Sequence, residues 1–140
     1  MPLLCGRALH RDRRTYALLM ALTIVLGLAS RRFDAWLPFP LHKNTGDVLW
    51  AVMVCWLAVL LFPARSLTFL AGISAFYAVG IECSKLIHAP WLVAFRATTL
   101  GHLVFGAVFS WADLLDYGIG ILLAAALNHW IQSLHRPRRN

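Results

Sequence analysis

Apolar residues in this chain gather into long, nearly unbroken runs instead of alternating with polar positions. Four such runs cover residues 15–29, 46–62, 67–87 and 114–131. A helix needs about 20 residues to cross the hydrocarbon core. The shorter runs reach this length when Trp, Tyr, Arg and Lys at their ends lie at headgroup level. The pattern predicts an all-α polytopic membrane protein with four transmembrane helices.

The segments between the runs predict how the helices connect. Residues 33–45 contain two prolines at alternate positions, which disfavours helix there. Residues 63–66 are long enough only for a tight antiparallel helix hairpin. The His-Ala-Pro-Trp sequence at 88–91 breaks the third helix, and the apolar stretch 98–109 is too short for a span. It predicts a short re-entrant or interfacial helix before the last span.

The first apolar run also has the features of a secretory signal peptide, with a basic start and small residues at its end. Because more apolar runs follow it, we expect an uncleaved signal-anchor helix. The predicted organisation is a basic N-terminus over 1–14, one transmembrane helical domain over 15–132 and a basic tail over 133–140.

Composition and charge narrow the class of protein further. Apolar residues make up 60% of the chain and charged residues 14%, which is about half the usual charged share. The net charge of +7 could suggest nucleic acid. However, the basic residues flank the apolar runs and form no face interleaved with aromatic residues, as single-strand binding requires. We therefore expect membrane lipids and no nucleic acid as partners.

The basic residues also predict an orientation, because the cytoplasmic ends of spans carry the excess of Lys and Arg. Four spans place both termini on one side. With the termini inside, eight basic residues are cytoplasmic and five are outside: Arg7, Arg11, Arg13, Arg14, Arg65, Arg136, Arg138 and Arg139, against Arg31, Arg32, Lys43, Lys85 and Arg96. The bias favours a cytoplasmic N-terminus and a cytoplasmic C-terminus.

The acidic residues then collect on the outer side. All except Asp12 fall at outer helix ends or in outer loops: Asp34, Asp47, Glu82, Asp113 and Asp116. Charges close to an apolar run are costly, so they usually pair or face a cavity. Glu82 and Lys85 share a helix face, as do Asp113 and Asp116, because each pair is three residues apart. Arg96 is the natural cation between these carboxylates, because its planar fork binds a carboxylate or a phosphate bidentately.

The same residues carry a resemblance to a known family. Glu82-x-x-Lys85, Arg96 after a Pro-Trp loop, and Asp113 opening a Gly-containing apolar helix resemble the VanZ-like membrane proteins, together with Gly-Leu-x-Ser-Arg at 27–31 and Gly-Asp-x-Leu-Trp-Ala at 46–51. The similarity covers roughly residues 20–125 and is greatest to short bacterial members of unknown function. The family usually has glutamine at the position of Lys85.

The resemblance implies a location, a set of site residues and a context. The location is the bacterial cytoplasmic (inner) membrane. Position by position, the singled-out residues are Arg31, Asp47, Glu82, Arg96 and Asp113. The family's best-known association is with resistance to lipid-tailed glycopeptide antibiotics, which leaves the activity of this chain open.

The sequence indicates no cofactor, no metal and no catalytic residue. His88 and His102 lie 14 residues apart, and neither an H-E-x-x-H motif nor a zinc-ligand spacing occurs. No G-x-S-x-G element marks a nucleophilic serine.

Three hypotheses from different classes therefore stand. In the favoured one, the residues that the resemblance singles out bind a lipid or cell-envelope precursor headgroup, such as an anionic lipid or a polyprenyl phosphate, with Lys85 and Asp116 as secondary candidates. Arg31 and Arg96 would contact the anion, and Glu82 and Asp113 would orient the arginines. In the second, the same charges staple helix ends in a structural subunit of a larger membrane complex. In the third, the protein is a lipid-modifying enzyme with Glu82 or Asp116 as general base.

Overall fold

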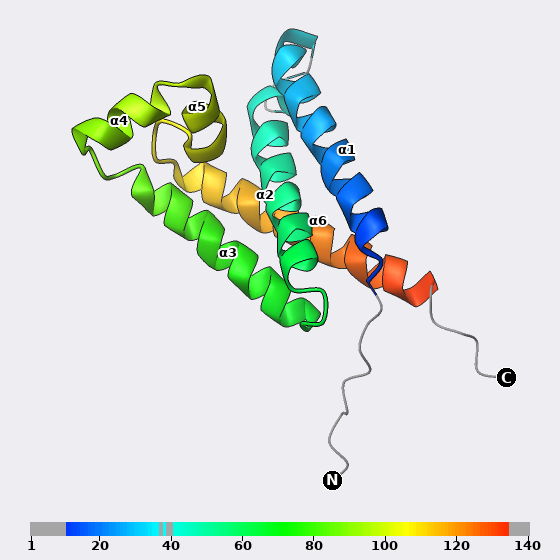
Figure 1. Cartoon of the computed structure of the whole chain (residues 1–140). Helices are drawn as coiled ribbons and strands as arrows, with labels where there is room; N and C mark the ends of the chain where they lie inside the picture. The colour runs from blue at the N-terminus through cyan, green and yellow to red at the C-terminus, as the bar shows by residue number, and fades with distance from the viewer. Residues whose placement is uncertain (1–10, 37, 39–40, 135–140) are drawn as a thin grey trace, which may run out of the picture.

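The computed structural model describes residues 11–36, 38 and 41–134, with the side chains of 34 and 41–43 excepted. Within these residues the chain is helical and contains no strand. The elements are α1 (Arg13–Arg32), a short 3-10 turn η1 (Asp34–Trp36), α2 (Leu41–Leu61), α3 (Leu67–Ser84), α4 (Pro90–Arg96), α5 (Thr99–Phe105) and α6 (Trp111–Leu134) (Figure 1). The predicted basic ends concern mainly residues 1–10 and 135–140, which lie outside the described residues.

Four of these helices are long and apolar enough to cross a membrane: α1, α2 from Asn44 onward, α3 and α6. This confirms the prediction of an all-α chain with four candidate spans. Helices α4 and α5 have seven residues each. At about 1.5 Å per residue each is only about 10 Å long, which is far too short to cross.

The proline-containing segments behave differently from the prediction. Helix α2 begins at Leu41, inside the segment 33–45 that was expected to be non-helical. The physical reason is that proline is excluded from a helix interior but is tolerated at or before the first turn. Pro90 similarly occupies the first turn of α4, where its missing N–H costs nothing. The break at 88–91 therefore ends one helix and starts another.

The short helix predicted over 98–109 covers fewer residues in the structure, where α5 spans Thr99–Phe105. The Thr98 side chain accepts a hydrogen bond from Gly101 N at 3.1 Å and caps the start of α5. Gly106 ends the helix with φ at +62°, a backbone conformation that glycine adopts without strain. Residues 106–110 then run as an irregular segment into α6.

Capping side chains explain where α1 and α3 begin. Asp12 accepts a hydrogen bond from Arg14 N at 3.2 Å, and this bond lowers the pKa of the exposed Asp12 carboxyl below 3.8. The cap is therefore ionised at neutral pH. Ser66 accepts from Phe69 N at 3.2 Å at the start of α3. Each capping side chain satisfies an amide that the first helical turn leaves without a partner.

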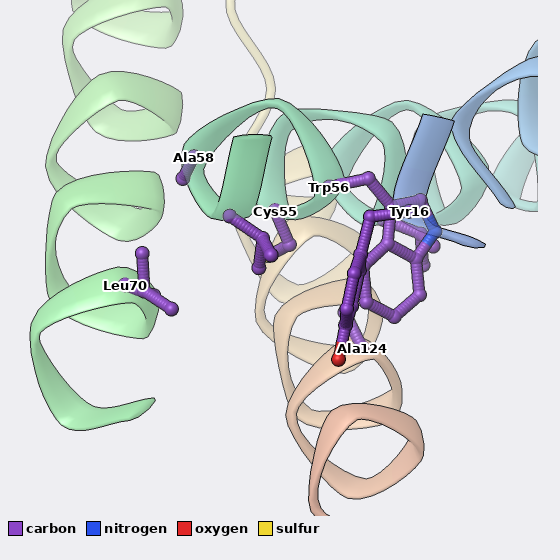
Figure 2. Packing of buried hydrophobic residues seen from close by; sticks show 8 residues of the cluster. Tyr16, Cys55, Trp56, Ala58, Leu70 and Ala124 are labelled. Atoms are coloured by element: carbon purple, nitrogen blue, oxygen red, sulfur yellow. The ribbon is translucent and has the colours of Figure 1, made fainter. Parts of the chain in front are cut away.

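Helix α2 lies at the centre of the bundle, with α1 and α6 packed on it and α3 packed on both α6 and α2 (Figure 1). The main apolar cluster joins all four spans (Figure 2) and consists of Tyr16, Val52, Cys55, Trp56, Ala58, Val59, Leu70 and Ala124. The polar atoms of its large rings are paired inside the bundle, because the Tyr16 hydroxyl donates to Asn128 Oδ1 at 2.7 Å and Trp56 Nε1 donates to Thr23 Oγ1 at 3.2 Å. Such hydrogen bonds and close packing hold helices together where lipid surrounds them.

Arg11 ties the start of α1 to the connection between α2 and α3. Its guanidinium donates to Pro63 O at 2.8 Å and to Arg65 O at 2.6 Å. Burial lowers the pKa of Arg11, but an arginine remains protonated at any physiological pH. The cation therefore holds two carbonyl groups of the hairpin that connects α2 to α3.

The four spans bring their charged ends to two opposite ends of the bundle. At the end drawn uppermost in Figure 1, α1 and α3 finish and α2 and α6 begin, with α4 and α5 close by. We call this the upper end. The opposite end holds the start of α1, the end of α6 and the hairpin that follows α2. The candidate site residues from α1, α2, α3 and α6 all lie at the upper end.

Gly120 is the point of closest approach between α2 and α6. A Cβ atom there would lie 2.4 Å from Val48 O and 2.8 Å from Ala51 Cβ. We expect Gly120→Ala to destabilise the protein by about 1–3 kcal/mol, because the two backbones must move apart. Thermal unfolding in detergent, followed by size-exclusion chromatography, measures this effect.

Gly118→Ala is the matched control, because nothing lies within 4 Å of the Cβ position at Gly118 on the same helix. It should leave the unfolding temperature unchanged or raise it slightly, since alanine is the better helix former. Equal effects of the two substitutions would contradict the close contact between α2 and α6.

Candidate functional site

Three carboxylates meet at the upper end, where α2 crosses α6. Asp47, Asp113 and Asp116, which we call the acidic trio, each offer one oxygen atom, and these atoms all lie within 4.8 Å of one another. Asp113 and Asp116 are buried, and Asp47 is half-buried. The contact at Gly120 explains the arrangement, because Asp47 precedes Val48 on α2 and Asp116 lies one turn before Gly120 on α6.

Lys85 lies beside the acidic trio and joins the end of α3 to the start of α6. Its Nζ atom is 2.6 Å from Glu82 Oε2 and 3.2 Å from Asp113 Oδ2. Lys85 is 5% exposed and Glu82 is completely buried. At such depth an ion pair is maintained only when further hydrogen bonds complete it.

Glu82 receives those further hydrogen bonds from α6 and the segment before it. The Tyr117 hydroxyl donates to Glu82 Oε2 at 3.1 Å, and Ser110 N donates to Glu82 Oε1 at 2.7 Å. Both carboxylate oxygens of Glu82 are therefore bonded within the protein. This geometry suits a residue that holds its neighbours in place and does not favour Glu82 as a general base.

A cleft of about 490 Å³ opens next to these charges. Its polar lining comes from Arg31, Asp47, Lys85, His102, Asp113 and Tyr117, and its apolar wall comes from Trp50 and residues 103–108. Clefts of this size accommodate small ligands or parts of larger ones. The arrangement combines carboxylates, cations and an apolar surface in a single opening.

Arg31 reaches the cleft from the last turn of α1. A side chain at Gly46 would meet Arg31 Nε at 3.3 Å, so the arginine lies over the start of α2. Arg31 is exposed even though it lines the cleft. Its guanidinium is therefore accessible to a ligand, unlike the buried ammonium of Lys85.

Arg96 has a different place from the one expected. Its guanidinium is buried and donates to Ile87 O at 2.9 Å, to Ser84 Oγ at 3.4 Å and to Ser84 O. Ser84 is the last residue of α3 and Ile87 follows it, so the cation lies at the C-terminal end of this helix, where positive charge is favourable. Lys85 occupies the position between Glu82 and Asp113, so the expectation that Arg96 lies there and is oriented by these carboxylates is wrong.

Arg96 lines a second cavity of about 620 Å³ between α4 and α5. The cavity and the cleft share three lining residues, His102, Leu103 and Ala107. Helix α5 and residues 106–107 therefore form the wall between the cavity and the cleft. The structure thus brings Arg31, Asp47, Lys85, Asp113 and Asp116 together, connects Glu82 to them through Lys85, and leaves Arg96 behind α5.

Sequence reasoning missed three contributors to the site: Tyr117, Ser110 and His102. Tyr117 could have been found, because it lies four residues after Asp113 and shares its helix face. The bond from Ser110 N has no sequence signal, because every residue except proline carries the same backbone amide. His102 was considered only as a metal ligand, and it lies exposed on the cleft wall.

The acidic trio is also the only group of three potential metal ligands that converges in the part of the chain described here. Carboxylate oxygens are the ligands of hard cations such as Mg²⁺ and Ca²⁺. The trio offers three protein oxygens, and such ions need six or more, with the rest coming from water or from a bound phosphate. The spacing of His and Cys residues gave no indication of this group.

These features define a multi-pass membrane protein with a mixed-charge cleft at one end of a four-helix bundle. The chain belongs to the family described as Protein of unknown function (DUF2809), whose model matches residues 36–121. The match contains Asp47, Glu82, Lys85, Asp113 and Asp116. No solved structure matches the chain.

The ion pairs of Lys85 predict a strong dependence of stability on this residue. Lys85→Met leaves the buried Glu82 and Asp113 without their shared cation, and we expect a loss of about 3–5 kcal/mol in the free energy of unfolding. Titration with a denaturing detergent, followed by tryptophan fluorescence, measures the change.

Two further variants test the cause. Adding Glu82→Gln to Lys85→Met removes one of the two carboxylates that lost their bond to Lys85 and should recover part of the loss. Tyr117→Phe removes one neutral donor from Glu82 and should cost only about 1 kcal/mol. If Lys85→Met is as stable as the wild type, the ion pairs do not hold α3 to α6.

Proposed function

We propose that this protein binds the polar headgroup of a membrane lipid or of a lipid-linked cell-envelope precursor in the cleft. The observation that carries the proposal is the lining of the cleft, which combines an exposed arginine and two carboxylates, Asp47 and Asp113, with an apolar wall. A lipid presents the same combination, with a charged headgroup joined to an apolar body. The cleft lies where four spans end, at the level at which headgroups are found.

The segment from α4 to the start of α6 supports an interfacial position for the cleft. Several of its large apolar side chains are more than 70% exposed: Trp91, Leu100, Val108 and Trp111. Tryptophan prefers the boundary between hydrocarbon and water. We propose that α4 and α5 lie in this boundary and cover the cleft from the membrane side.

The distribution of basic residues supports a placement of the cleft on the outer face. Arg11, Arg13, Arg14 and Arg65 lie at the end opposite the cleft. Over the whole sequence, eight basic residues against five favour a cytoplasmic position for that end. We propose the bacterial cytoplasmic membrane, with both termini on the inner side. The resemblance to VanZ-like proteins, whose best-known association is with resistance to lipid-tailed glycopeptide antibiotics, belongs to the same proposal.

A structural subunit of a membrane complex is the second candidate. The closed network of Glu82, Lys85, Tyr117 and Ser110 favours it, because such a network stabilises helix ends without any ligand. It leaves the exposed Arg31 on the cleft without a role. Headgroup binding accounts for both features, since the closed network then supports the floor of an open site.

Native mass spectrometry of the gently extracted protein tests headgroup binding. We expect a lipid to remain bound to the wild type and to be lost at least about tenfold more readily from Arg31→Gln, since a charge-assisted contact to the headgroup is removed. Arg32→Gln is the matched control, because Arg32 is the exposed neighbour and is absent from the cleft lining.

The outcomes separate the two candidates. Loss of lipid in Arg31→Gln with retention in Arg32→Gln supports headgroup binding. A stoichiometric protein partner without lipid, unchanged in both variants, would replace the proposal with the structural subunit.

A further inference from the structure

The cavity between α4 and α5, which we call the second cavity, has a lining of different charge from that of the cleft. Its polar side chains come from α4, α5 and the connections next to them: His88, Arg96, Thr98, Thr99 and His102. In the described part of the chain no carboxylate belongs to this lining, whereas Asp47 and Asp113 line the cleft. The second cavity therefore presents one permanent positive charge and no negative one.

The hydrogen bonds of Arg96 leave one of its donors over. Arg96 is 6% exposed, and its terminal nitrogen atoms Nη1 and Nη2 donate to Ile87 O and to Ser84. Its Nε atom is buried and has no hydrogen-bond partner among the described residues. A buried donor without an acceptor is unfavourable. An acceptor supplied from outside the chain would therefore be stabilising at this atom.

The positive charge of Arg96 is balanced only by neutral groups. Carbonyl and hydroxyl oxygens accept from the guanidinium, and no carboxylate among the described residues forms an ion pair with it. Charged side chains at the level of membrane spans usually pair with an opposite charge or face a cavity. Because the surroundings have a low dielectric constant, the charge acts beyond direct contact and attracts an anion into the second cavity.

From these observations we propose that the second cavity binds a phosphate group, one oxygen of which accepts the hydrogen bond from Arg96 Nε. The site is separate from the cleft, because α5 and residues 106–107 lie between them. It is therefore independent of headgroup binding in the cleft. Arg96 has two roles on different atoms, since Nη1 and Nη2 hold the end of α3 and Nε is left for the ligand.

The other polar side chains of the lining supply further donors. The imidazoles of His88 and His102 and the hydroxyl of Thr99 belong to exposed residues that line the second cavity. Thr98 adds no donor, because its hydroxyl already donates to Phe95 O at 2.6 Å. Donors on several sides favour a tetrahedral phosphate over a planar carboxylate, because a phosphate offers acceptor oxygens in more directions.

The site is also prepared for binding before a ligand arrives. The bonds to Ile87 O and Ser84 fix the Arg96 guanidinium, so little conformational freedom is lost when an anion binds. Val93 and Leu103 line the same cavity, and Val93 is 47% exposed. These apolar side chains can contact the carbon atoms next to a lipid phosphate. The shared chemistry of the ligand is thus a phosphate, carried either by a soluble ion or by a lipid.

Two probes test the inference on the full chain. Inorganic phosphate is titrated into the detergent-solubilised protein and followed by isothermal titration calorimetry. Phosphatidic acid and phosphatidylcholine with identical acyl chains are compared in nanodiscs, and bound lipid is counted by native mass spectrometry. We expect phosphatidic acid to be retained at least about tenfold over phosphatidylcholine, because choline brings a positive charge toward the arginine.

Variants locate the bound phosphate. His88→Ala removes an imidazole that lines the second cavity and not the cleft, and it should weaken phosphate binding at least about tenfold. His129→Ala is the matched control, because His129 is exposed on α6 and lines neither space. Arg96→Lys keeps the charge without the Nε donor and should weaken binding similarly. If Arg96→Lys fails to fold, His88→Ala and the wild-type comparison of lipids decide.

Each outcome supports or overturns the inference. Weaker binding in His88→Ala or in folded Arg96→Lys, with normal binding in His129→Ala and Arg31→Gln, supports it. Binding of inorganic phosphate then assigns the soluble ion as a sufficient ligand, and selection of phosphatidic acid alone assigns the lipid.

No binding of inorganic phosphate together with no preference for phosphatidic acid would overturn the inference, as would binding that neither His88→Ala nor Arg96→Lys changes. Loss of binding in Arg31→Gln alone would also overturn it and assign the anion to the cleft, which leaves headgroup binding there standing.

Discussion

The close approach of α2 to α6 at Gly120 is the constraint on which the upper end of the bundle depends. A Cβ atom there would lie 2.4 Å from Val48 O, so the two helices can meet at this distance only around a glycine. Asp47 and Asp116 each lie within about one helical turn of this crossing point. The contact therefore determines how far apart their side chains lie. Since α1 and α6 both pack on α2, the same contact also positions Arg31 relative to the acidic trio.

Once the helices meet there, electrostatics in a low-dielectric region dictates the rest of the site. Buried carboxylates must be compensated by a cation, by donors or by a ligand. Glu82 forms an ion pair with Lys85 and accepts hydrogen bonds from the Tyr117 hydroxyl and from Ser110 N, so both of its carboxylate oxygens are bonded. Beside this network, Asp47 and Asp113 line the open cleft together with the exposed Arg31. The protein thus has a closed half that supports the helices and an open half that is available for binding.

The segment between α3 and α6 gives the cleft its second wall. Arg96 fastens α4 to the carbonyl groups at the end of α3, and Gly106 turns the chain back toward α6. The Arg96 guanidinium donates to backbone carbonyl groups and Gly106 shapes the backbone itself, so both residues have a structural role here. The sequence does not distinguish an arginine that caps a helix C-terminus from one that binds a ligand. Only the position of the hydrogen-bond acceptors in the structure distinguishes them.

The sequence by itself determined the number and approximate extent of the spans, because runs of apolar residues reflect the thickness of the hydrocarbon core and little else. It also determined that Arg31, Asp47, Glu82 and Asp113 share one end, since alternating spans place alternate helix ends together. Only the tertiary structure decided that Lys85 and not Arg96 joins Glu82 to Asp113, and that Asp116 belongs with Asp47. The physical reason is that pairing depends on helix rotation and on contact distances of a few ångströms. These follow from packing at positions such as Gly120, which hydrophobic periodicity does not encode.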